Sequence, residues 1–194
     1  MLKNLLRSLR AGRAPGLNEA GLARWHAGDL AGAERAFRAA VDAAPGFAPA
    51  YGNLGMVLWE QRRLDEGLAR LARAVELDPR HANARLNLAN VLAMAGRPAE
   101  AVAHYREVLR LAPDHAEARA NLVRPLMDLC EWDAVSAEVA RLNERWARAG
   151  AGEWLDCVTP FNSLLLPLAP ELRFAIARHH AGRVAARAGA PLRR

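Results

Sequence analysis

The sequence has few residues of the kinds that build disulfide frameworks, β-sheets or membrane spans. Its 194 residues include two cysteines, Cys130 and Cys157, which form no C-x-x-C pair and no metal-ligand spacing. Aromatic residues make up 6%, and the strand formers Val, Ile, Thr and Tyr are scarce. The longest apolar run, Leu164–Ala169, is interrupted by Pro167 and is far too short to cross a bilayer. We therefore expect a soluble, cytoplasmic protein with no membrane partner.

Lysine is nearly missing as well, because Lys3 is the only one in the chain. Arginine carries the rest of the positive charge, and the net charge is +6. Residues 1–13 contribute +4 and residues 171–194 contribute +5, whereas the residues between them sum to −3. An arginine-dominated, alanine-rich composition is typical of a GC-rich bacterial genome rather than of a phosphate-binding surface. The charge therefore predicts no nucleic-acid partner.

What the sequence has in abundance is alanine and leucine, which are strong helix formers. They recur with a fixed period, since Pro45, Pro79 and Pro113 fall 34 residues apart and end similar segments. We take this proline as position 32 of a repeated unit. The resulting units cover residues 14–47, 48–81, 82–115 and 116–148.

Small residues recur at positions 8 and 20 of the unit, and a large residue recurs at position 24. In unit order these residues are Gly21, Gly55 and Ala89, then Ala33, Gly67 and Ala101, then Phe37, Leu71 and Tyr105. Apolar spacing of three and four residues predicts two helices per unit, which would cross at the small positions. Gly28 and Gly96 mark the turn between these helices.

These positions resemble the tetratricopeptide-repeat family. The resemblance implies an all-α, right-handed superhelix of antiparallel helix pairs, in which the first helix of each unit lines a concave groove. The fourth unit departs from the pattern, with Val123 and Val135 at its small positions and Cys130 at its turn, and such atypical units end repeat arrays. We expect a basic helix over residues 1–13, and a linker with a C-terminal helix over residues 149–194.

Asparagine recurs at position 6 of the first helix as Asn53, Asn87 and Asn121, and Asn90 adds a second amide at position 9. Asparagine is a mediocre residue inside a helix, because its side chain competes for backbone hydrogen bonds. One interpretation is a ladder of carboxamides that donate to and accept from an extended peptide. The other is that each asparagine braces a neighbouring helix.

Other residues on the same helix face are apolar and adaptable. Met56, Trp59 and Met94 would form a floor beneath a bound peptide, although tryptophans such as Trp59 also serve to cover neighbouring helices. No phosphate loop, nucleophile elbow or paired-carboxylate motif is present, so we expect no catalytic residue and no cofactor. The adjacent pair His179–His180 lacks partners at ligand spacing, and we expect no metal site.

The C-terminal third resembles the segment that joins the repeats to the glycosyltransferase domain in protein O-GlcNAc transferases, including the bacterial SPINDLY-type homologues. The resemblance rests on Cys130–Asp133, on Leu166–Leu168 and on Arg173 in the segment "PELRFAIAR". In that family the groove asparagines hold the protein substrate. The lobes that bind the UDP-sugar have no counterpart in these 194 residues, so no catalytic residue can be carried over.

The resemblance implies the substrate-recognition part of an O-GlcNAc-transferase-like protein, either as a fragment of a longer enzyme or as a natural stand-alone chain. In both cases the partner would be a protein or an extended peptide in the groove. An adaptor for complex assembly, unrelated to glycosylation, is the alternative, because the fold alone does not choose between functions. A nucleic-acid adaptor using the basic ends ranks third, and self-association stays open.

Overall fold

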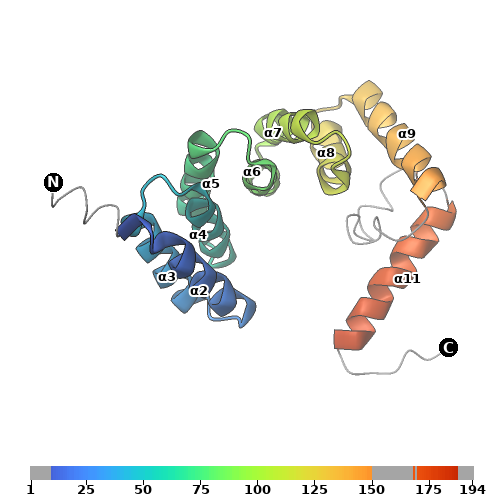
Figure 1. Cartoon of the computed structure of the whole chain (residues 1–194). Coiled ribbons are helices and arrows are strands. Elements are labelled where there is room, and N and C mark those ends of the chain that lie inside the picture. The colour runs from blue at the N-terminus through green and yellow to red at the C-terminus, as the bar shows by residue number, and fades with distance from the viewer. Residues whose placement is uncertain (1–9, 150–167, 169, 188–194) are drawn as a thin grey trace. The chain divides into compact units, whose positions relative to one another are not determined.

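The computed structural model describes residues 10–149, 168 and 170–187, and every regular element among them is an α-helix (Figure 1). These helices divide into two compact units, residues 1–111 and 112–194. Within the described ranges, no helix is long and apolar enough to cross a membrane. Most of the helix predicted over residues 1–13 lies outside the described residues. So does most of the predicted linker, including Cys157, Leu166 and Pro167.

The first unit consists of three helix pairs. Its helices are α2 (Ala14–His26), α3 (Leu30–Ala43), α4 (Ala48–Glu60), α5 (Leu64–Leu77), α6 (Ala82–Met94) and α7 (Pro98–Leu111). Within each pair the two helices pack against each other across a short turn, and the first helices also contact in sequence, α2 with α4 and α4 with α6. The second helices α3 and α5 end just before Pro45 and Pro79. The predicted fold class, an all-α array of antiparallel helix pairs, is confirmed.

Each turn between paired helices contains one residue in the left-handed backbone region. Gly28 and Gly96 have φ of 81° and 72°, as the sequence predicted, since glycine adopts this conformation without steric cost. Arg62 in the second repeat and Cys130 in the fourth have φ of 66° and 58° at the same repeat position. The turn geometry therefore persists where glycine is absent, at the cost of a side chain in a disfavoured conformation.

The crossing of α4 and α5 is a backbone-to-backbone contact. A Cβ atom added to Gly55 would lie 2.7 Å from Cγ of Leu71 and 2.9 Å from the carbonyl oxygen of Gly67. Leu71 is fully buried beside this contact. In the first repeat, a Cβ atom on Gly21 would lie 2.5 Å from the ring of Phe37. The small residues are therefore needed because the second helix occupies the space of a side chain.

A second recurring feature of the fold is the junction between repeats. Nδ1 of His81 accepts a hydrogen bond from the amide of Ala84 at 3.1 Å, which caps the N-terminus of α6. Nη2 of Arg85 donates to the carbonyl oxygen of Pro79 at 2.7 Å. In the second unit the same positions form the same bonds at 3.3 and 2.6 Å, between His115 and Ala118 and between Arg119 and Pro113. Pro79 and Pro113 are thus each tied to the helix that follows them.

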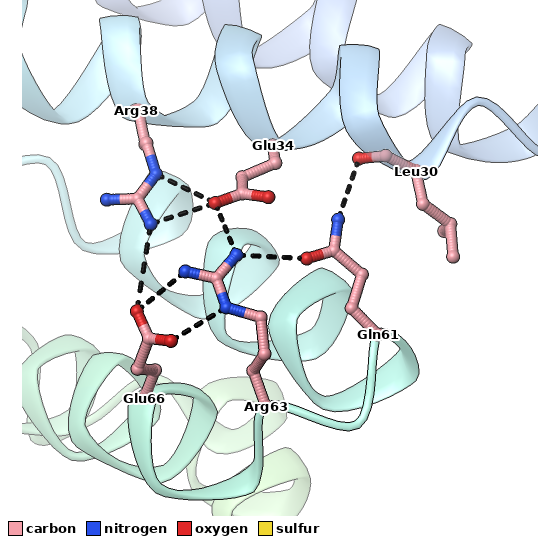
Figure 2. Close-up of polar contacts among 6 residues, drawn as sticks. All are labelled: Leu30, Glu34, Arg38, Gln61, Arg63 and Glu66. Atoms are coloured by element: carbon pink, nitrogen blue, oxygen red, sulfur yellow. Dashed lines mark hydrogen bonds and ion pairs between the residues drawn. The ribbon is translucent and has the colours of Figure 1, made fainter.

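Repeats one and two are also joined by a network of charged side chains, shown in Figure 2. Glu34 on α3 accepts from Arg38 at 2.9 Å and from Arg63, at the start of α5, at 2.8 Å. Arg63 also forms a two-pronged pair with Glu66 at 2.7 Å. Gln61 donates to the carbonyl oxygen of Leu30 and accepts from Arg63. We call Glu34, Arg38, Arg63 and Glu66 the inter-repeat network.

The second unit contains α8 (Ala116–Asp128), α9 (Trp132–Ala149) and α11 (Pro170–Arg187). Helix α8 packs on α9, with Val123 and Val135 buried, and it continues past Pro125 to Asp128. Arg119 and Glu138 form a 2.6 Å ion pair between the two helices, with side chains 14% and 12% exposed. Helix α11 is the predicted C-terminal helix, in which Ile176 is fully buried.

Candidate functional site

The first helices of the first unit carry two of the predicted asparagines at corresponding positions. Asn53 lies in the middle of α4 and Asn87 in the middle of α6, and both side chains are half-buried. Helices α2, α4 and α6 contact one another in order, and Asn53 and Asn87 hold equivalent positions, 34 residues apart, on two of them. We call the α2, α4 and α6 surface that carries Asn53 and Asn87 the asparagine face.

Asn53 makes a hydrogen bond that the sequence did not reveal. Its Nδ2 donates to Oδ1 of Asn18 in α2 at 2.9 Å, and Asn18 is only 8% exposed. A carboxamide has two donor hydrogens and two acceptor lone pairs. Asn53 therefore braces repeat one against repeat two, and among the described residues its second N–H and its Oδ1 have no partner. Asn53 thus fits both interpretations in part, because one N–H braces a neighbouring helix and the remaining groups could bind a peptide.

Asn87 differs from Asn53, because it forms no hydrogen bond to any residue in the described part of the chain. Asn87 is half-buried in the middle of α6, so its amide is reachable from solvent. A polar group in this position has donors and acceptors to offer a ligand. Among the predicted asparagines of the first unit, Asn87 therefore fits a binding role most directly.

Asn90 braces the neighbouring helix α7. Its Oδ1 accepts a 2.6 Å hydrogen bond from the hydroxyl of Tyr105, which lies on α7 and is 1% exposed. A buried tyrosine hydroxyl needs a partner, because leaving it unpaired costs free energy. Asn90 therefore satisfies the hydroxyl of the large residue that fills the third helix crossing.

The predicted apolar floor is only partly open to solvent. Met56 and Trp59 are half-buried on α4, whereas Met94 at the end of α6 is 67% exposed. Trp25, from the equivalent position of the first repeat, donates to Glu60 through Nε1 at 3.0 Å and packs edge-on against Phe37. Trp25 thus covers its neighbouring helices, and Met94 is the most exposed of the three predicted floor residues.

Asn121 lies in α8, in the second unit, where its side chain is half-buried. It occupies the same repeat position as Asn53 and Asn87, and its place in a common site rests on that sequence register.

His179 and His180 meet edge-on, with ring centroids 5.6 Å apart. Across the described residues, no group of three His, Cys, Asp or Glu side chains could hold a metal ion.

Comparisons with known proteins agree with this architecture. One tetratricopeptide-repeat family model matches residues 53–116, and another matches residues 24–76 and 92–145. No curated protein sequence matches the chain.

Several solved structures are similar. A mutant of the O-GlcNAc transferase of Thermobaculum terrenum is 29% identical with a TM-score of 0.56, over 60% of this chain and 22% of that one. The chain thus spans about a fifth of that transferase, and it resembles the transferase's tetratricopeptide-repeat region.

Two further structures share the fold. MamA is 18% identical with a TM-score of 0.66, over 75% of this chain and 85% of that one. YrrB, described as a tetratricopeptide-repeat protein with an unusual peptide-binding site, is 24% identical with a TM-score of 0.60, over 68% of each chain. Because one repeat model alone matches more than half of its residues, the chain belongs to the tetratricopeptide-repeat family.

Proposed function

We propose that the chain is a protein-binding scaffold whose asparagine face holds an extended peptide segment by its backbone. The observation that carries this proposal is that Asn87, half-buried in the middle of α6, has no hydrogen-bond partner among the described residues. Asn53 adds an unpaired N–H and an unpaired carbonyl oxygen on the neighbouring first helix. The similarity to YrrB, a protein described by its peptide-binding site, supports a peptide as the ligand.

The amides determine what kind of ligand is recognised. Each one donates to a peptide carbonyl and accepts from a peptide N–H, and these groups recur in any sequence. A net gain of about 0.5–1.5 kcal/mol per hydrogen bond gives modest affinity from each contact. Exposed Met94 adds a flexible apolar surface that accepts side chains of different shapes. We therefore expect broad binding with weak sequence preference.

More specifically, we propose that the chain is the substrate-recognition part of an O-GlcNAc-transferase-like protein. Support comes from the 29% identity with the Thermobaculum terrenum transferase and from the junction-like segments at Cys130–Asp133 and around Arg173. In this role the array selects the protein to be modified, and the chemistry resides in catalytic lobes. An adaptor for complex assembly is the alternative.

A selected peptide tests the general proposal. A displayed library of random peptides is panned against the purified chain, and the best binder is then remade with each side chain replaced by alanine and with single backbone N-methyl groups. Backbone recognition predicts that N-methylation weakens binding far more than the alanine replacements do. Binding lost at one alanine replacement and indifferent to N-methylation would contradict the proposal.

Competition tests the transferase-specific part. The purified chain is added in excess to the Thermobaculum terrenum transferase, UDP-GlcNAc and one of its protein acceptors. We expect modification of the acceptor to slow, because the free array sequesters it, and a variant with Asn53, Asn87 and Asn121 all replaced by alanine should not compete. If peptides bind but no competition occurs, the chain is an adaptor rather than a transferase component.

A further inference from the structure

The surface between neighbouring second helices differs sharply from one repeat junction to the next. Between repeats one and two, the space between α3 and α5 is occupied by the inter-repeat network, with Glu34 and Arg38 facing Arg63 and Glu66 (Figure 2). Glu34 is only 16% exposed, so these charged side chains fill the junction as well as linking it. This junction is closed by polar contacts.

Between repeats two and three, half of that network is missing. Arg97 and Glu100 form the same two-pronged pair as Arg63 and Glu66, at 2.6 and 2.7 Å. On the facing helix α5, however, Leu68 and Ala72 occupy the positions of Glu34 and Arg38. Neither residue can reach across the junction to form an ion pair, and Ala72 is much shorter than arginine. A cavity of about 320 Å³ remains between α5, α6 and α7.

This α5–α7 cavity has an apolar floor and a charged rim. Leu68, Leu88 and Leu92 line its interior. Arg97 and Glu100 on the rim already satisfy each other, whereas Asp65 has no ion-pair or hydrogen-bond partner in the described part of the chain. Asp65 acts on Arg97 only through its longer-range charge. The rim therefore offers one unpaired carboxylate beside a pocket that suits a hydrocarbon group.

The cavity is separate from the asparagine face. Successive residues of a helix are turned by about 100°, so Asn87 projects from a different side of α6 than Leu88 and Leu92 do. Both leucines are buried, at 4% and 3% exposure, and line the cavity together with residues of α5 and α7. A ligand in the cavity would therefore leave the asparagines unoccupied.

We propose that the α5–α7 cavity is a second docking site, which takes one leucine-sized side chain of a partner segment that carries a basic residue next to it. The volume lies at the lower end of the range for ligand pockets, which suits a single apolar anchor. Asp65 supplies the charge complementarity for the arginine or lysine. A second globular copy is a poorer occupant, because a stable interface buries more than about 1,000 Å² and one small pocket contributes little of that.

His104 at the cavity edge is compatible with a basic ligand at neutral pH. Burial lowers the pKa of His104 below its ordinary value of 6.5, and the positive charge of Arg85, whose Nη1 lies 3.4 Å from Nδ1, lowers it further. The nearby Glu100 opposes this shift. The imidazole is therefore mostly neutral at pH 7 and adds little repulsion against an incoming cation.

The test uses the full chain and a helix-forming, capped alanine peptide with one leucine and an arginine one helical turn further on. Methyl NMR of the protein follows Leu68, Leu88 and Leu92 during the titration. We expect saturable shifts at these methyls, and none with a peptide in which the leucine is replaced by alanine. Leucine methyls that do not respond, or that respond equally to both peptides, would overturn the proposal.

Two variants sharpen this test. Asp65→Asn should lower the affinity for the leucine–arginine peptide about two- to fivefold, as expected for one exposed charge pair. The affinity for a matching leucine–glutamine peptide should not change. The double variant Leu68→Glu with Ala72→Arg rebuilds the first junction's network and should abolish binding while helicity is kept. Wild-type affinity in either variant would contradict the proposal. Binding to the asparagine face is expected to survive both changes, so the two sites can fail independently.

Discussion

Repeats two and four follow the same chain path but close their helix crossings with different residues. In repeat two, Gly55 and Gly67 bring the two backbones into contact, so no side chain fits between them. In repeat four, Val123 and Val135 occupy the same two positions and are buried, at 0% and 7% exposure. The comparison shows that helix starts and turns determine the path of a repeat, whereas the residues at the crossing determine what fills its centre.

Gly55→Leu should have the largest effect, because it breaks the repeat-two crossing. The new side chain would begin 2.9 Å from the carbonyl oxygen of Gly67, and backbone cannot rotate away as a flexible side chain can. We expect a loss of about 1–3 kcal/mol or more in the free energy of unfolding, measured by urea denaturation followed by circular dichroism. Gly16→Leu is the matched control, since nothing lies within 4 Å of its added Cβ. Equal stability of the two variants would refute the close crossing.

Val123→Ala tests the opposite requirement in repeat four. Val123 is fully buried, so removing two methyl groups loses their transfer free energy and leaves a small cavity. We expect a destabilisation of about 2 kcal/mol, seen in the same urea experiment. Ser136→Ala on the exposed face of α9 serves as the control and should change little. A neutral Val123→Ala would mean that repeat four has collapsed around a smaller crossing than the structure describes.

The charged clusters of the two units extend the comparison, because Glu34 joins two repeats whereas Glu138 joins the two helices of one repeat. Glu34→Ala should cost about 1 kcal/mol at neutral pH, by loss of hydrogen bonds from Arg63 and Arg38. Glu76→Ala, in an ion pair whose carboxylate side is 63% exposed, should cost only a few tenths. Comparable losses in the free energy of unfolding of both variants would show that the inter-repeat network stabilises the protein no more than an exposed ion pair does.

Acid should erase the effect of Glu34. Burial tends to raise the pKa of Glu34, but hydrogen bonds from Arg63, Arg38 and Gln61 outweigh it and hold the pKa below 4.5. The unfolded chain then binds this proton more readily than the folded one, so the stabilisation is complete above pH 4.5 and is lost as pH falls through the lowered value. The stability difference between wild type and Glu34→Ala, measured against pH, should shrink in that window.

The smallest expected effect concerns the left-handed turn residues. Arg62→Gly should stabilise the first unit by about 0.5–1 kcal/mol, because Arg62 has φ of 66°, which glycine adopts without strain. Cys130→Gly should act similarly in the second unit, where φ is 58°. The urea midpoint measures both changes. Destabilisation by either substitution would show that the native side chain makes contacts worth more than the strain it causes.

The repeat architecture could be predicted from the sequence because it depends on local features that recur. The prolines at 45, 79 and 113 gave the period, and the helices α2, α4, α6 and α8 begin at Ala14, Ala48, Ala82 and Ala116. Gly28 and Gly96 identified the turns because few other residues tolerate positive φ. Such signals persist whatever surrounds them.

Contacts between unlike repeat positions could not be predicted in this way. Asn18 sits one position before the aligned asparagines, so a comparison of equivalent positions passes over its bond to Asn53. Tyr105 was predicted only as a large residue that fills the crossing, although its hydroxyl donates a hydrogen bond to Asn90. The α5–α7 cavity exists because Leu68 and Ala72 cannot reach across the junction between repeats two and three. Only the three-dimensional structure shows such a gap.

The most direct test of the central proposal is the affinity of one library-selected peptide for Asn87→Ala, measured by isothermal titration calorimetry beside the melting temperature. Asn87 has no hydrogen-bond partner among the described residues, so its removal should weaken binding about two- to tenfold and leave the melting temperature unchanged. Asn53→Ala, which also breaks the bond to Asn18, should lower both quantities. Unchanged affinity with an early melt in Asn87→Ala would contradict the account and make the asparagine purely structural.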